Sequence, residues 1–166
     1  GGKIFNCHEF VLSARSPVFR AMFRSNMTEK RTKSVTIADI SPDAIEKMLH
    51  YIYNGEVAQG DQPELNGELL KAAEKYELGM MKKVCEERLC HGLELKNAIK
   101  NLSLGEMFGA TKLMMAAMEL LASNMSSVID TEEWESCIKH HPALVTEVMR
   151  VMVDKKGTKR KIDLVE

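Results

Sequence analysis

Two groups of cysteine and histidine side chains are the residues of this chain best suited to bind a metal ion. The first group falls on one expected helix and the second near the end of another: Cys85, Cys90 and His91, and Cys137, His140 and His141. Structural zinc sites usually bring closely spaced ligand pairs on turns. Cys85 instead falls in an apolar stripe, where a free cysteine behaves as a small hydrophobic side chain. No metal or other cofactor is predicted.

The motifs of nucleophilic catalysis and phosphate binding are missing from the sequence. No serine lies in a G-x-S-x-G elbow, and no glycine-rich phosphate loop occurs. His8 precedes an expected helix and has the chemistry of a general base. A structural imidazole, partly buried and held by hydrogen bonds near the helix start, is the simpler interpretation. We expect a non-catalytic protein.

A polar stretch over residues 24–33 carries one apolar side chain with no core to join. Met27 is followed two positions later by Glu29, and the surrounding residues are polar or basic. An exposed methionine needs another reason, and docking into an apolar pocket of a partner supplies one. The pair therefore predicts a contact with another protein.

The elements before this stretch are two short helices. Phe10, Val11 and Ala14 share one face at helical spacing, and a second apolar set follows them. Ser16-Pro17 between the two sets is typical of an N-cap followed by proline in the first helical position. The two helices are thus expected to meet at a fixed break.

Short strands and further helices are expected in the rest of the first half. Residues 34–37 alternate and are β-branched, and residues 3–5 resemble a strand end, so both are predicted as strands. Ser41-Pro42 begins a helix that Asn54-Gly55 ends, and two more helices follow. Residues 1–92 are therefore predicted to form an α+β domain.

The second half is expected to be entirely helical. Its helical patterns cover residues 95–104, 111–124, 131–139 and 142–153. The tail over residues 154–166 is charged and without periodicity, which predicts disorder. Its basic cluster over residues 155–161 has three open interpretations: a nuclear-import signal, a nucleic-acid patch or a solvated end.

Composition excludes several broad classes. The net charge is −1, from 23 basic and 24 acidic residues, which gives no overall attraction to nucleic acid or to anionic membranes. No apolar run is long enough to span a bilayer, and no signal peptide is seen. The four scattered cysteines suit reduced thiols in the cytosol or nucleus. Because the chain begins with Gly1-Gly2-Lys3, we expect it to be part of a longer protein.

Three stretches together resemble the BTB/POZ domain. H-x-x-x-L-x-A-R-S-P-V-F-x-A-M-F runs from His8 to Phe23, M-x-x-x-I-Y-x-G covers residues 48–55, and L-L-x-A-A-x-K-Y covers residues 69–76. Over about residues 3–153 the chain is similar to the C-terminal half of speckle-type POZ proteins. The resemblance implies a BTB/POZ fold without its first elements over residues 1–92, and a helical extension of the 3-box or BACK type over residues 93–153.

The resemblance also implies a function. Proteins of this kind are substrate adaptors of cullin-3 RING ubiquitin ligases, present in the nucleus, the cytoplasm or both. By analogy Met27 would dock on the cullin, Glu29 would orient the loop, and the helices over about residues 95–122 would add a second contact. Phe10 and Val11 would complete an interface between copies of the protein, which would form a homodimer or a higher oligomer. Ubiquitination substrates would bind to a MATH domain that precedes this stretch.

A second class of BTB protein remains open on the sequence. BTB transcriptional regulators or scaffolds dimerise and recruit corepressors. The regulators normally continue into a linker and zinc fingers, whereas this chain continues directly into helices. An enzyme is the third alternative and has no motif in its favour. Neither nucleic acid nor membrane is expected as a partner.

Overall fold

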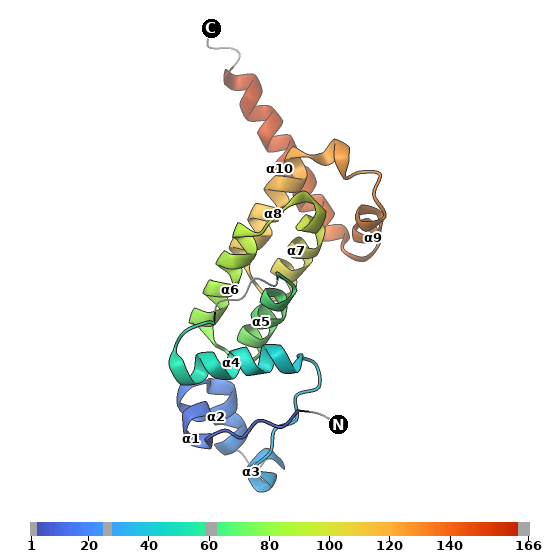
Figure 1. The fold of residues 1–166 in the computed structure, drawn as a ribbon. Coiled ribbons are helices and arrows are strands. Elements are labelled where there is room, and N and C mark those ends of the chain that lie inside the picture. The colour runs from blue at the N-terminus through green and yellow to red at the C-terminus, as the bar shows by residue number, and fades with distance from the viewer. Residues whose placement is uncertain (1–2, 25–27, 59–62, 163–166) are drawn as a thin grey trace. The chain divides into compact units, whose positions relative to one another are not determined.

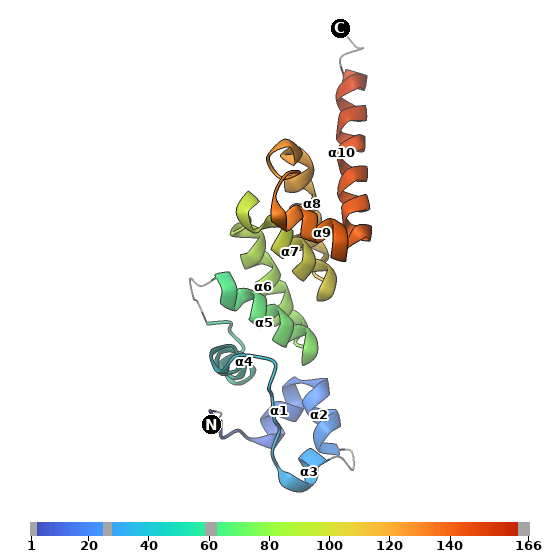
Figure 2. The ribbon, with the colours of Figure 1, turned by 90° about the vertical axis from the view of Figure 1, so that its right-hand side faces the viewer.

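The computed structural model describes residues 3–24, 28–58 and 63–162 (Figures 1 and 2). The chain divides into two compact units, residues 1–89 and residues 90–166. Each unit has its own buried core, and each is described by itself below. None of the described helices is long and apolar enough to cross a bilayer.

Within the described residues, six helices begin in the first unit. In chain order they are α1 (Glu9–Arg15), α2 (Pro17–Arg24), α3 (Thr28–Thr32), α4 (Pro42–Asn54), α5 (Pro63–Lys75) and α6 (Gly79–His91). Helices α1 and α2 form a short hairpin, α4 packs on α5, and α1 also contacts α4. These helices carry the surfaces described in the next section.

The predicted helix ends of the first unit are confirmed. The Ser16 hydroxyl accepts a hydrogen bond from the Phe19 amide at 3.2 Å, and the Ser41 hydroxyl accepts one from the Ala44 amide at 3.3 Å. Both serines precede a proline in the first helical position. Gly55 ends α4 with φ +81°, a left-handed conformation that glycine adopts without a steric penalty.

Ser16 and an aromatic stack join the α1–α2 hairpin to the end of α5. The fully buried Ser16 hydroxyl donates to the Tyr76 carbonyl oxygen at 2.7 Å. The Phe19 ring lies almost parallel to the Tyr76 ring, with 4.5 Å between centroids, a stacked arrangement that adds to the burial of both rings. Large apolar side chains of α4 and α5 are also buried, among them Met48, Ile52, Leu69 and Leu70.

The α+β prediction is not confirmed, because the described residues contain no strand. Residues 34–38 form an extended connection in which Val35 and Ile37 are half-buried and their neighbours are exposed, so the predicted alternation is present. A strand also requires a ladder of backbone hydrogen bonds to a second segment. In the described part of the chain, neither this connection nor residues 3–7 have such a ladder.

The second unit contains the predicted helices. They are α7 (Leu95–Met107), α8 (Thr111–Ser123), the 3-10 turn η1 (Met125–Ser127), α9 (Glu132–His140) and α10 (Pro142–Ile162). Its core is built around the fully buried Trp134, with Leu102, Leu121 and Val148 from three other helices. Helices α7 and α8 lie side by side (Figure 2).

The C-terminal segment differs from the sequence prediction. Helix α10 continues to Ile162, whereas disorder was expected from residue 154. Lys155 explains part of the difference, because its ammonium group donates to the Glu119 carbonyl at 3.2 Å and to the Ser123 hydroxyl at 2.9 Å. Basic residues at the end of a helix also interact favourably with the helix dipole.

Candidate interaction surfaces

An open groove lies between α1 and the end of α4. Its volume is about 300 Å³, and its lining comes from two short segments: Phe10, Val11, Ala14 and Arg15, and Ile52, Tyr53, Asn54 and Gly55. Phe10 is 83% exposed, Tyr53 is 42% exposed, and Val11 is half-buried. The structure thus places Phe10 and Val11, the two residues predicted for dimerisation, in one surface groove. Their role in dimerisation stays a prediction.

Polar contacts at Tyr53 hold the start of α1 against α4. The His8 amide donates to the Tyr53 hydroxyl oxygen at 2.7 Å, and His8 Nδ1 lies 3.0 Å from the same oxygen. The imidazole is held by hydrogen bonds as expected, but it is exposed and not partly buried. At the other end of the groove the Arg15 guanidinium lies over the Tyr51 ring, 5.9 Å from its centroid. Contacts at both ends thus join α1 and α4 beside the groove.

Of the two residues predicted to contact the cullin, the structure describes one. Met27 lies outside the described residues. Glu29 is in the short helix α3, where its side chain is half-buried. Helix α3 packs on α2, so Glu29 is held next to the α1–α2 hairpin.

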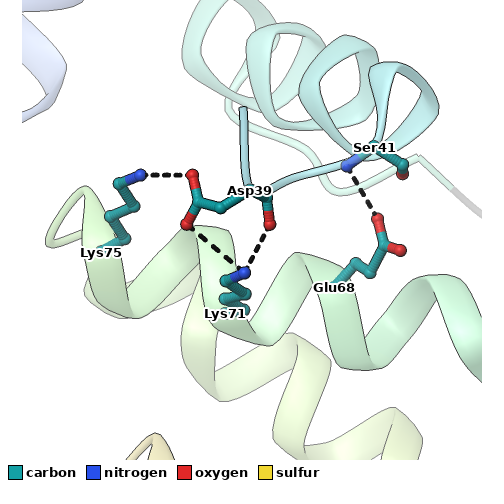
Figure 3. Close-up of polar contacts among 5 residues, drawn as sticks. All are labelled: Asp39, Ser41, Glu68, Lys71 and Lys75. Atoms are coloured by element: carbon teal, nitrogen blue, oxygen red, sulfur yellow. Dashed lines mark hydrogen bonds and ion pairs between the residues drawn. The ribbon is translucent and has the colours of Figure 1, made fainter. Parts of the chain in front are cut away.

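A cluster of charged side chains fixes the connection between α3 and α4. We call Asp39, Lys71 and Lys75 the Asp39 clasp (Figure 3). Lys75 Nζ lies 2.6 Å from Asp39 Oδ1, and Lys71 Nζ lies 3.3 Å from Asp39 Oδ2. Lys71 also donates to the Asp39 carbonyl oxygen. Both lysines are on α5, so the clasp ties the extended connection to that helix.

A hydrogen bond beside the clasp holds the start of α4. The Ser41 amide donates to Glu68 Oε2 at 3.1 Å (Figure 3). Because Ser41 is also the N-cap of α4, Glu68 fixes the residue at which this helix begins. Glu68 and the two lysines of the clasp thus contact this connection from one face of α5.

Charge and burial shift two pKa values in this region. The hydrogen bond from Lys75, supported by Lys71, holds the pKa of Asp39 below its usual range. Burial, with a smaller effect of the nearby Asp39 charge, raises the pKa of Tyr76 to about 12. Asp39 is thus ionised and Tyr76 neutral at physiological pH. Since both shifts come from contacts that hold the fold together, they indicate a structural role for the two groups.

The buried cysteines are protonated thiols. Cys85 is fully buried, as its place in an apolar stripe predicts, and burial raises its pKa to about 11. Burial, with a smaller effect of the Glu106 charge, also raises the pKa of Cys137. A thiol is a metal ligand or nucleophile only as the thiolate, so these environments oppose both roles. Within the described residues, no three His, Cys, Asp or Glu side chains could together hold a metal ion.

Sequence reasoning missed the residues that complete these surfaces. In the sequence Tyr53 stands out only as part of the motif over residues 48–55, yet its hydroxyl holds the start of α1. Lys71 and Lys75 have a signal in the sequence, since their spacing of four residues puts them on one side of a helix. Nothing local indicates that Asp39 is their shared partner, because the contact joins residues more than thirty positions apart.

Comparison with known sequences supplies the family. The sequence profile of the BTB/POZ domain matches residues 1–93, a range that covers the first unit and ends just beyond it. The chain belongs to the BTB/POZ domain family.

Several mouse proteins share more than the BTB/POZ domain with this chain. TD and POZ domain-containing protein 1 of Mus musculus is 36% identical over 149 residues, which are 90% of this chain and 41% of the mouse protein. TD and POZ domain-containing protein 3 of the same species is 36% identical over 155 residues, which are 93% of this chain and 42% of that protein. The chain thus spans about two fifths of the length of these relatives, and the similarity includes most of the second unit.

Proposed function

We propose that this chain is the cullin-binding part of a substrate adaptor in a cullin-3 RING ubiquitin ligase. In this proposal the protein supplies binding surfaces, and ubiquitin is transferred on other subunits. The BTB/POZ domain would bind the cullin near α3, and helices α7 and α8 would add a second contact. The protein has no catalytic step of its own.

One observation carries the proposal: a helical unit with its own core directly follows the BTB/POZ domain. The unit begins at residue 90, and its first two helices, α7 and α8, pack on each other. The sequence resemblance to cullin-3 adaptors implies a 3-box in this helical unit. A regulator of the zinc-finger type would continue into a linker and fingers at this position, so the helical unit favours the adaptor.

Self-association belongs to the same proposal. The exposed Phe10 and half-buried Val11 provide an apolar face next to Tyr53. Burying such side chains in a second copy contributes about 25 cal/mol for each Å² of apolar surface removed from water. A dimer would present two cullin-binding surfaces.

Substrates and location are further parts of the proposal. By the resemblance to speckle-type POZ proteins, substrate binding is assigned to a domain of the MATH type before this stretch. The mouse relatives are more than twice as long as the matched region. The basic residues over 155–161 would direct the protein to the nucleus. Replacing Lys159, Arg160 and Lys161 by Ala in a tagged full-length protein should then lower its nuclear fraction, and an unchanged fraction would remove the import signal from the proposal.

Calorimetry with the N-terminal domain of cullin-3 tests the adaptor proposal. Wild type should bind, and Met27→Ala should weaken binding by about tenfold to a hundredfold, because a buried methionine contributes roughly 1.5–3 kcal/mol. Glu29→Ala should weaken it less, by about fivefold, because in this proposal the Glu29 side chain orients the loop through a hydrogen bond of about 1 kcal/mol.

Met80→Ala is the matched control for Met27→Ala. Met80 is 63% exposed at the start of α6, away from α3 in the sequence, so its loss should leave the affinity unchanged. No binding by wild type at low salt, or equal affinities for both methionine variants, would contradict the proposal.

A further inference from the structure

Four basic side chains gather on α2, α3 and the residue after α3. Arg24 ends α2, Lys30 and Arg31 lie in α3, and Lys33 follows it, and all four are exposed. We call them the basic surface. With Glu29 as the one acid of residues 24–33, this stretch carries a charge of +3 in a chain whose net charge is −1. The positive charge is therefore concentrated locally.

The basic surface lacks counter-charges within the described part of the chain. None of its four side chains makes an ion pair or a hydrogen bond there. Several other lysines of the first unit make ion pairs instead: Lys71 and Lys75 with Asp39, and Lys82 with Glu74 at 2.6 Å. Because α3 is only five residues long and packs on α2, like charges are held close together and repel one another.

The backbone at Lys33 supplies a second, independent observation. Its φ is +50°, in the left-handed region where glycine or asparagine would be favoured over a residue with a long side chain. Residues held in such conformations cluster at functional sites. A lysine at this position adds a positive charge to the basic surface, although its backbone conformation is strained.

We infer that the basic surface docks an acidic face of a protein partner. Opposite charges on the partner would remove the repulsion and raise the rate of association, an effect that salt weakens. A protein fits better than a nucleic acid for two reasons. Residues 24–33 contain no aromatic side chain on which a base could stack, and the half-buried Glu29 carboxylate would repel phosphates.

This inference rests on the proposed function for the identity of the partner, and it adds the chemistry of the contact. The region proposed to bind the cullin would then recognise its partner through charge as well as through an apolar side chain. The partner surface opposite Lys30 and Arg31 should be rich in Asp and Glu. Binding should therefore depend strongly on ionic strength.

The test compares two charge-reversal variants of the whole chain with the same change in net charge. K30E/R31E alters the basic surface, and K83E/K139E alters two exposed lysines without a described partner on α6 and α9. Neither variant should melt below the wild-type temperature, because none of the four side chains holds a described contact. Association with the cullin-3 N-terminal domain is measured at about 50 mM and about 300 mM salt.

Wild type should bind at least about tenfold more weakly at the higher salt. K30E/R31E should be at least about tenfold weaker than wild type at the lower salt and should lose most of the salt dependence, while K83E/K139E stays within about twofold of wild type. If wild type binds but the two variants behave alike, the inference is wrong and the adaptor proposal stands.

If wild type does not bind the cullin domain at all, the adaptor proposal fails, and a second probe decides the inference. A glutamate peptide of about ten residues should shift the backbone amide resonances of residues 28–33 in wild type and not in K30E/R31E. Shifts confined to other residues, or tighter binding of a DNA duplex or an RNA strand of equal charge, would overturn the inference.

Discussion

The Ser16 side chain joins the start of α2 to the end of α5. Its hydroxyl oxygen accepts from the Phe19 amide and donates to the Tyr76 carbonyl. Ser16→Ala removes the N-cap of α2, at a cost of about 1 kcal/mol, and leaves a buried carbonyl unsatisfied, at a cost of about 1–3 kcal/mol.

Denaturant unfolding should therefore show Ser16→Ala to be about 2–4 kcal/mol less stable than wild type. Ser34→Ala is the matched control, because Ser34 is exposed and its hydroxyl makes no described hydrogen bond. A difference of less than about 0.5 kcal/mol between the two variants would show that the two hydrogen bonds of Ser16 do not stabilise the fold.

The Asp39 clasp predicts a pH dependence of stability. The folded-state pKa of Asp39 lies below its ordinary value of 3.8, so the unfolded chain takes up the proton first as the pH falls. The stabilisation by the clasp is thus fully present above that value and is lost as the pH falls through the lower folded-state pKa.

Asp39→Asn should lower the melting temperature at neutral pH, and the difference from wild type should shrink as the pH falls below 3.8, the ordinary pKa of this group. Asp130→Asn, at an exposed position with no described contact, should match wild type throughout. If the Asp39→Asn difference stayed constant with pH, the ion pairs would not be its cause.

Helices α7 and α8 pack closely at Gly105. A Cβ added at the buried Gly105 would lie 2.8 Å from Met114 Cβ and 2.9 Å from Met114 Cα. Such distances force the backbone of α8 to move, so Gly105→Ala should destabilise the protein by about 1–3 kcal/mol.

Gly79→Ala provides the comparison, because a Cβ at Gly79 meets nothing within 4 Å and alanine favours the helix more than glycine does. Its unfolding free energy should equal or slightly exceed that of wild type. Equal stability of the two variants would mean that α7 and α8 do not pack as closely as described.

Elements with local signals could be predicted from the sequence, and those that need a distant partner could not. Ser16-Pro17, Ser41-Pro42 and Asn54-Gly55 mark helix ends through contacts within a few residues, and all three are confirmed. Residues 34–37 have the pattern of a strand, but a strand is defined by a second segment. The Asp39 clasp and the hydrogen bonds of Lys155 to α8 were missed for the same reason.

For the whole chain, the groove beside α1 predicts weak self-association. Phe10 is mostly exposed, so light scattering should show a mass that rises with concentration, and Phe10→Ser should abolish that rise. Met107→Ser, at another exposed apolar position, should leave it unchanged. A tight dimer that survives Phe10→Ser would place the interface elsewhere.

The family of the chain could be recognised from its sequence, whereas its candidate surfaces required the structure. The motifs around His8, Ile52 and Lys71 predicted the BTB/POZ domain that the comparison confirms. They did not show that Phe10 shares a groove with Tyr53, because side chains from α1 and α4 meet only in the folded chain.

Hydrogen–deuterium exchange of the whole chain, with and without the N-terminal domain of cullin-3, tests the adaptor account most directly. The account predicts slower exchange of backbone amides in two places, α3 with its flanking residues and helices α7 and α8, and no change in α9. Protection confined to the groove between α1 and α4, or no protection at saturating cullin domain, would contradict it.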